Sequence, residues 1–287
     1  SQISEDFPMN PDAQISARPD KPVRHILALS GGKDSSALAV YLHRKIENLE
    51  YVFCDTGKEL DETYEYLAKL EAFLGKEIHV LKHQSGHGFD EILKIKKGFL
   101  PSPEFRWCTE YLKLKPYEAF IGDDLAISYV GIRADEPHRT GYVSTKPNIK
   151  AVFPFIENNI RLEDVERILE DSGLGMPRYY EWRSRSGCYF CFYQQKREWI
   201  GLLQNHPELF EEAKKYEKIN PETGVRYTWN RGESLDELAQ RAEEILEEYE
   251  RRKEREANAF KKHQKLKDIW GSAPKDGEVL SCKICRF

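Results

Sequence analysis

The sequence predicts an α/β fold, in which a parallel sheet with flanking helices is followed by a mainly helical C-terminal region. Two observations lead to this prediction. Short apolar runs that suit buried strands alternate with segments of helical periodicity through the first half of the 287-residue chain. Strand-like runs become rare after about Pro154. Helices between consecutive strands favour right-handed βαβ units, and therefore parallel strands.

The expected strands are short apolar runs, and they lie at residues 25–30, 51–55, 77–82 and 126–132. The expected helices carry apolar residues at helical spacing, at residues 33–46, 61–74, 89–96, 162–172, 195–205, 207–216 and 234 to about 267. We therefore expect three parts. Residues 1–22 form an irregular N-terminal arm, residues 23–157 a nucleotide-binding domain, and residues 158–287 a helical domain that ends in a cysteine-containing tail.

Composition limits the classes of protein that this chain can be. Hydrophobic residues make up 40% and charged residues 32% of the sequence, which is typical of a folded globular protein and not of a disordered one. No apolar run approaches the ~20 residues of a membrane span, and the opening residues do not resemble a signal peptide. We expect a cytoplasmic protein with no membrane partner. The formal net charge of −5 gives no global attraction to nucleic acid, so a polyanion would need a local basic surface.

The strongest local signal is a glycine-rich loop between the first expected strand and the first expected helix. Its residues are Ser30, Gly31, Gly32, Lys33, Asp34 and Ser35. Two glycines let the backbone approach an anion, and the N–H groups at a helix start suit a phosphate. A serine-capped glycine turn is the alternative interpretation. The spacing G-x-x-x-x-G-K-[ST] of the Walker A loop is absent.

This S-G-G-K-D-S loop resembles the PP-loop of the adenine-nucleotide α-hydrolase superfamily, which includes 3'-phosphoadenylylsulfate (PAPS) reductases, ATP sulfurylases and tRNA-thiolating enzymes. Asp55-Thr56-Gly57, directly after the second strand, resembles the D-T-G segment that lies beside the adenosine in that family. Gly131 and Arg133 begin a segment similar to the family's G-x-R-x-x-E. The resemblance implies that all three segments bind ATP, with its pyrophosphate in the loop.

Two cysteine segments narrow the resemblance, which covers about residues 24–199. Residues 105–109 read F-R-W-C-T and residues 186–191 read S-G-C-Y-F-C. Both are similar to one PAPS-reductase-like branch, the ATP pyrophosphatase and sulfurtransferase component of bacterial DNA phosphorothioation systems of the Dnd and Ssp types, which act in phage defence. The E-C-G-[IL]-H segment that true PAPS reductases carry near their C-terminus is absent.

The six cysteines predict a metal centre better than a disulfide framework, because the cytoplasm keeps thiols reduced. Cys188 and Cys191 can present two thiolates to one centre, and Cys108 can supply a third. In a [4Fe–4S] cluster, either Cys282 or Cys285 would be the fourth ligand, or one iron would stay free to hold sulfide or substrate. A structural zinc site is one alternative, and a tail cysteine that carries persulfide is another.

Two further groups leave alternatives open. His83 and His87 are either near the substrate or solvated loop histidines. The aromatic and basic side chains just before the C-x-x-C motif either contact nucleic acid or pack between parts of the protein: Tyr179, Tyr180, Trp182, Arg183 and Arg185.

The resemblance implies a two-step reaction. An acceptor oxygen, expected on the DNA backbone phosphate, would attack the α-phosphate of ATP, with Lys33 and Mg²⁺ stabilising the departing pyrophosphate and Asp34 or Asp55 positioning the metal. Sulfur from a cysteine desulfurase would then displace AMP, and other phosphorothioation subunits would be partners. The alternatives are tRNA thiolation, PAPS reduction and a non-catalytic nucleotide-sensing scaffold.

Overall fold

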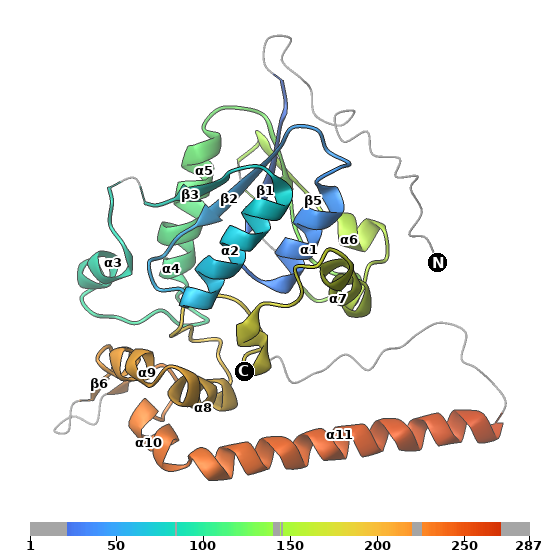
Figure 1. The fold of residues 1–287 in the computed structure, drawn as a ribbon. Helices are drawn as coiled ribbons and strands as arrows, with labels where there is room; N and C mark the ends of the chain where they lie inside the picture. The colour runs from blue at the N-terminus through green and yellow to red at the C-terminus, as the bar shows by residue number, and fades with distance from the viewer. Residues whose placement is uncertain (1–21, 84, 140–143, 145, 220–225, 271–287) are drawn as a thin grey trace. The chain divides into compact units, whose positions relative to one another are not determined.

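The computed structural model describes residues 22–83, 85–139, 144, 146–219 and 226–270, and side chains up to residue 258 (Figure 1). The chain divides into two compact units, of which the first ends at Leu238 and the second begins at Ala239. In the part that the structure describes, no helix is long and apolar enough to cross a membrane.

The first unit contains a five-stranded sheet in which every pairing is parallel, with the strand order β3-β2-β1-β4-β5. The strands are β1 (Arg24–Leu29), β2 (Leu49–Cys54), β3 (Ile78–Leu81), β4 (Ala126–Tyr129) and β5 (Ile149–Val152). The predicted α/β class and the four predicted strands are therefore confirmed. The fifth strand was not predicted, since the four residues Ile149–Val152 include a lysine and carry too weak an apolar signal.

Alternate residues of the strands bury opposite faces of the sheet, as the period of a strand requires. On one face, Leu27 and Leu29 pack with helices α1 (Lys33–Leu42), α2 (Asp61–Leu74) and α7 (Leu162–Asp171). On the other face, Ile26 and Val52 pack against the helix α5 (Lys115–Ile121). The unit is thus a helix–sheet–helix sandwich, which explains why its strands are apolar on both sides (Figure 1).

The helical segment that contains Pro116 was not predicted, because the proline interrupts its helical pattern. It consists of α4 (Trp107–Thr109), a π-helical turn η2 (Glu110–Leu114) and then α5. Pro116 lies in the first turn of α5, where its missing N–H costs least, and the wider π turn precedes it. The helix therefore continues from Cys108 into the packed core.

The remaining elements of the first unit are mainly helical, as predicted. They are α3 (Phe89–Ile95), α6 (Pro154–Glu157), the 3-10 turn η3 (Arg178–Glu181), α8 (Lys196–Asn205), α9 (Pro207–Lys214), the short antiparallel strands β6 (Lys218–Ile219) and β7 (Arg226–Tyr227), and α10 (Leu235–Gln240), which ends two residues past the unit boundary. Phe89, Phe190 and Trp229 form an aromatic core, with ring centroids 4.5 Å apart for Phe89–Phe190 and 4.8 Å apart for Phe190–Trp229.

The second unit contains the long charged helix α11 (Ala242–Trp270). The division at residues 238/239 differs from the predicted boundary at 157/158. The physical reason is that Val165 and Leu169 of α7 are fully buried in the same core as α1, so the segment after residue 157 completes the sheet unit.

Candidate functional site

The glycine-rich loop lies at the carboxyl end of β1, between the neighbouring strands β2 and β4. The chain order reverses at β1, because β2 and β3 lie on one side of it and the later strands β4 and β5 lie on the other. Open parallel sheets bind ligands at this kind of switch point. The D-T-G and G-I-R segments follow β2 and β4, so the fold brings together the three segments that the sequence singled out.

Hydrogen bonds close the loop on itself. Ser35 Oγ accepts from the backbone N–H of Ser30 at 3.1 Å and donates to the carbonyl of Gly32 at 3.2 Å. Gly31 adopts φ +70°, and a Cβ atom there would lie 2.5 Å from Thr63 Cγ2 in α2. Only glycine combines that conformation with that close approach to a helix.

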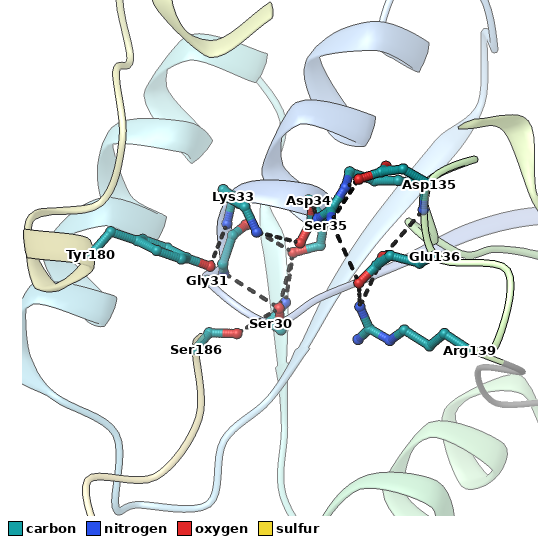
Figure 2. Close-up of polar contacts among 12 residues, drawn as sticks. Ser30, Gly31, Lys33, Asp34, Ser35, Asp135, Glu136, Arg139, Tyr180 and Ser186 are labelled. Carbon is teal, nitrogen blue, oxygen red and sulfur yellow. Dashed lines mark hydrogen bonds and ion pairs between the residues drawn. The ribbon is translucent and has the colours of Figure 1, made fainter. Parts of the chain in front are cut away.

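Lys33 and Asp34 belong to a charged network that crosses the switch point (Figure 2). Lys33 Nζ lies 3.0 Å from Asp34 Oδ2, and Arg133 Nη1 donates to Asp34 Oδ1 at 2.7 Å. Arg133 also donates to Asp135 at 2.9 Å, and its pKa is raised because these carboxylate contacts outweigh its burial. A Cβ atom on Gly131 would lie 3.1 Å from the carbonyl oxygen of Asp34, which explains the glycine. The G-I-R segment therefore holds the loop.

Three residues about 150 positions later in the chain also form hydrogen bonds to the loop. The sequence did not predict this role for them. The buried Tyr179 donates to the Gly31 carbonyl at 2.7 Å, and Ser186 Oγ donates to Ser30 Oγ at 3.1 Å. The Tyr180 hydroxyl accepts from the Lys33 N–H at 3.2 Å (Figure 2). No local pattern marks these contacts. The loop N–H groups expected to meet phosphate thus have protein partners here, because Gly32 N also donates to Ser30 Oγ at 3.3 Å.

The aromatic and basic run before the C-x-x-C motif mostly forms a packed region. Arg183 is only 2% exposed and donates to the carbonyls of Gly187 and Cys188. Trp182 packs against Gly201 of α8. Arg185, in contrast, is exposed. The packing interpretation therefore holds for four of the five residues.

The D-T-G segment has its own hydrogen bonds. Asp55 Oδ1 accepts from the Gly57 N–H at 2.8 Å and from the Tyr64 hydroxyl at 2.7 Å, while Lys82 Nζ lies 3.6 Å from Asp55 Oδ2. Thr56 donates to Glu59 at 2.9 Å. Asp34 and Asp55 are thus held by separate partners, and their role with Mg²⁺ stays a prediction.

The C-x-x-C segment lies against this D-T-G segment. Thr56 Oγ1 lies 3.2 Å from Cys188 Sγ, and the sulfur lies 3.8 Å from Glu59 Oε1. Burial, and then the negative charge of Glu59, raises the pKa of the Cys188 thiol. Burial and then Cys191 raise the pKa of Cys108. The fold therefore brings Cys108, Cys188 and Cys191 close enough to influence one another.

Lys113 is the cation of this cysteine region. Burial lowers its pKa, but the electrostatic attraction of Glu59 and the nearby cysteine side chains outweighs this, and its pKa is raised. Cys54 donates to the Lys113 carbonyl at 3.4 Å, and burial raises its pKa to about 11, in agreement with its predicted core position. Glu59 and Lys113 were not predicted as site residues, although Glu59 follows the D-T-G segment by two residues and Lys113 follows the R-W-C-T segment by four.

The predicted metal centre at the cysteines is tested only in part. Among the described residues, no three His, Cys, Asp or Glu side chains are arranged to hold a metal ion. Cys282 and Cys285 lie outside the described residues. The donor chemistry of Cys108, Cys188 and Cys191 fits an iron–sulfur or zinc centre, since both metals prefer thiolates.

The two loop histidines form an aromatic cluster with Tyr111. The rings of His83 and His87 stack with centroids 6.2 Å apart, and His83 also stacks on Tyr111. A cavity of about 300 Å³ is lined by His83, Lys115, Glu118, Ala119 and Lys146. No loop residue lines it.

Comparison with known families decides the class of protein. Residues 24–192 match the model of the phosphoadenosine phosphosulfate reductase domain, and they make up more than half of the chain. The chain belongs to this family. Members of the phosphoadenosine phosphosulfate reductase family carry out nucleotide-dependent chemistry that involves sulfur, which supports a PP-loop enzyme here. The predicted superfamily is therefore confirmed.

Sequence similarity to other proteins extends beyond residues 24–192. An uncharacterized protein of Methanocaldococcus jannaschii is 28% identical over 225 residues, which are 74% of this chain and 44% of that protein. An uncharacterized protein of Escherichia phage 186 is 26% identical, over 68% of this chain and 75% of that protein. The chain spans less than half the length of the archaeal relative.

Solved structures with similar folds include PAPS reductase from Candida auris in a phosphate complex, with a TM-score of 0.47 and 14% identity over 59% of this chain and 82% of that one. Another is the U34-tRNA thiolase NcsA from Methanococcus maripaludis with its [4Fe-4S] cluster. Its TM-score is 0.40, with 16% identity over 68% of this chain and 70% of that one.

Proposed function

We propose that this protein is an ATP pyrophosphatase and sulfurtransferase that adenylates an oxygen of the DNA backbone phosphate so that sulfur can replace it. The observation that carries the proposal is the contact between the nucleotide loop and the C-x-x-C segment. Ser186, two residues before Cys188, donates to Ser30 of the loop at 3.1 Å. A nucleotide phosphate and a sulfur-handling centre would therefore act on the same acceptor atom.

The chemistry needs two displacements at phosphorus. A non-bridging oxygen of the DNA phosphodiester attacks the α-phosphorus of ATP, and pyrophosphate leaves. Lys33 is the loop's mobile cation and stabilises the charge that develops on the pyrophosphate. Arg133 orients Asp34 and the start of α1 through its 2.7 Å hydrogen bond. Hydrosulfide then attacks the activated DNA phosphorus, and AMP leaves with the original oxygen. This displacement is redox-neutral, but persulfide sulfur from a desulfurase would first have to be reduced to hydrosulfide by two electrons from a thiol reductant.

Cys108, Cys188 and Cys191 would hold a [4Fe–4S] cluster. Either Cys282 or Cys285 would complete its ligands, or one iron would stay open and supply a binding position for the incoming sulfur. Zinc in the same thiolates would be structural instead. Mg²⁺ would neutralise the ATP phosphates, near Asp34 or Asp55. A cysteine desulfurase would deliver the sulfur, and other phosphorothioation subunits would present the DNA.

The test measures pyrophosphate release from ATP and transfer of radioactive sulfur into DNA, with a cysteine desulfurase present. Lys33→Ala should lower pyrophosphate release by about a hundredfold or more, because charge stabilisation of this kind contributes roughly that much. Lys69→Ala, at an exposed position of α2, removes the same charge away from the loop and should leave the rate unchanged.

Other outcomes would assign other functions. Sulfur transfer into tRNA but not DNA would indicate tRNA thiolation, and sulfite release from PAPS with a thioredoxin-type donor would indicate a reductase. If wild-type protein never releases pyrophosphate while Lys33→Ala abolishes binding to partner subunits, the protein is a nucleotide-sensing scaffold.

A further inference from the structure

We propose that Arg106, Arg185 and Tyr193, with the exposed ring of Phe105 beside them, form a surface that binds the phosphodiester backbone of a nucleic-acid acceptor. This inference rests on the proposed function, because it names the surface that would present the acceptor to the nucleotide loop and the cysteines.

The two arginines converge on one aromatic ring. The guanidinium carbon of Arg185 lies 4.8 Å from the centroid of the Tyr193 ring, and that of Arg106 lies 5.6 Å from it. The arginines are 79 positions apart in the sequence, and both are exposed, whereas Tyr193 is half-buried. Guanidinium groups stack on aromatic faces, which fixes their planes and leaves the N–H edges available to an anion.

Among the described residues, neither Arg106 nor Arg185 forms an ion pair with a carboxylate. The carboxylate nearest in sequence to Arg106 is Glu104, which instead accepts a hydrogen bond from Ser102 at 2.9 Å. Two uncompensated guanidinium groups around one ring attract a phosphate, which accepts hydrogen bonds from both.

Exposed aromatic rings continue the surface on the side of Arg106. Phe105 is 62% exposed, and its ring meets that of Phe99 edge-on with centroids 5.7 Å apart. Phe99 in turn meets Tyr227 at 6.1 Å, and these two rings are each 42% exposed. Nucleic-acid bases stack on exposed aromatic rings that lie beside arginines, whereas a small inorganic anion does not contact such rings.

The surface is joined to both parts of the candidate site. Arg185 precedes Ser186, which donates to Ser30 of the nucleotide loop. Arg106 is two residues before Cys108, and Tyr193 is two residues after Cys191. A phosphodiester held by the two arginines would therefore lie beside the segments that carry the loop contact and the cysteines. This placement favours an acceptor over the nucleotide itself.

The test is binding of fluorescein-labelled 20-nucleotide single-stranded DNA and the matching duplex to the full chain, without ATP, at several salt concentrations. The double variant Arg106→Gln/Arg185→Gln should weaken binding by about tenfold or more and reduce the slope of log K against log salt by roughly one to two, as loss of phosphate contacts does. Phe105→Ala should weaken single-stranded binding by about tenfold and affect the duplex less.

The matched control is Arg161→Gln/Arg167→Gln, which removes the same charge from exposed positions at helix α7 and should leave DNA binding unchanged. ATP affinity and circular dichroism should match wild type in all variants, so that misfolding is recognised. Equal losses in the two double variants, or no loss in the first, would overturn the inference. Loss of affinity for 3',5'-adenosine bisphosphate with unchanged DNA binding would also overturn it, because the anion would then be a nucleotide.

Failure of the proposed function gives a different result. If wild type binds DNA through these arginines but neither releases pyrophosphate nor transfers sulfur, the surface stands and the reaction assignment falls. If the double variant Arg106→Gln/Arg185→Gln still transfers sulfur into DNA and keeps its DNA affinity, the reaction stands and the surface falls.

Discussion

The nucleotide loop and the cysteine region lie side by side, yet their hydrogen bonding differs. The loop is tied by contacts from three separate segments, and both oxygens of Asp34 have cationic partners. In the cysteine region, buried Glu59 Oε2 and Arg183 Nε have no hydrogen-bond partner among the described residues. Buried polar atoms without partners are uncommon in folded proteins, so these two call for a specific explanation.

The difference in hydrogen bonding indicates that folding alone assembles the loop, whereas the centre that we propose at the cysteines also needs a metal. A phosphate site made of backbone and helix start is assembled by packing, whereas thiols whose pKa values are raised by burial have to lose protons before they bind a metal. Changes in the loop should therefore cost folding stability and nucleotide binding together. Changes at the cysteines should alter metal content and leave both unchanged.

The largest effect is expected from Gly31→Ala. The new Cβ would adopt a left-handed φ and lie 2.5 Å from Thr63 Cγ2, so we expect a loss of about 3 kcal/mol in the free energy of unfolding, with ATP binding abolished. Urea denaturation and calorimetric ATP titration measure these losses.

Gly75→Ala is the matched control, because Gly75 has φ +61° with no atom near its Cβ position, and it should cost about 1 kcal/mol. Thr63→Ser removes the clashing methyl and should restore part of the loss; absence of any rescue would contradict the packing argument.

A smaller effect is expected from Arg133→Met. The change leaves Asp34 without its second cation and Asp135 without its partner, at an ion pair whose arginine side chain is 10% exposed. We expect a loss of about 2 kcal/mol in unfolding free energy and weaker ATP binding. Arg139→Met, which breaks a pair whose arginine is 54% exposed, should cost at most about 0.5 kcal/mol. Equal losses from the two changes would show that the network across the switch point does not stabilise the loop.

The smallest effect on stability and ATP affinity is expected from Cys108→Ser, although it should remove the metal. After anaerobic purification, the variant should lose the broad absorption near 400 nm and its iron, while ATP affinity stays within about twofold of wild type. Cys54→Ser should keep the iron, since Cys54 contacts the Lys113 carbonyl in the core. Stoichiometric zinc without iron in wild type would refute the cluster and favour a structural site.

Much of the fold could be predicted because its signals are local. The helix at residues 61–74 was predicted with the bounds that the structure has, and the loop, D-T-G and G-I-R segments all lie at the carboxyl ends of predicted strands. The short strand at 149–152 and the helix through Pro116 could not be predicted, since packing overrides weak local preference there.

The site was less predictable for the same reason. Tyr179, Tyr180 and Ser186 act on a loop about 150 residues away, and no sequence period connects such partners. Arg185 was grouped with its neighbours by composition, but the fold buries Arg183 and exposes Arg185. Composition identified the right segment, and only the three-dimensional arrangement separated packing residues from exposed ones.

The π-helical turn at Glu110–Leu114 has a consequence for the direction of the residues before it. A π turn contains one residue more than an α turn, and each residue of an α-helix rotates the chain by about 100°. The helix after the turn is fixed, because Tyr117 and Ile121 are packed under the sheet. The extra residue therefore sets the direction around the helix axis in which Arg106 and Cys108 point. A one-residue deletion within the turn would rotate both side chains, while the apolar face of α5 would keep its packing.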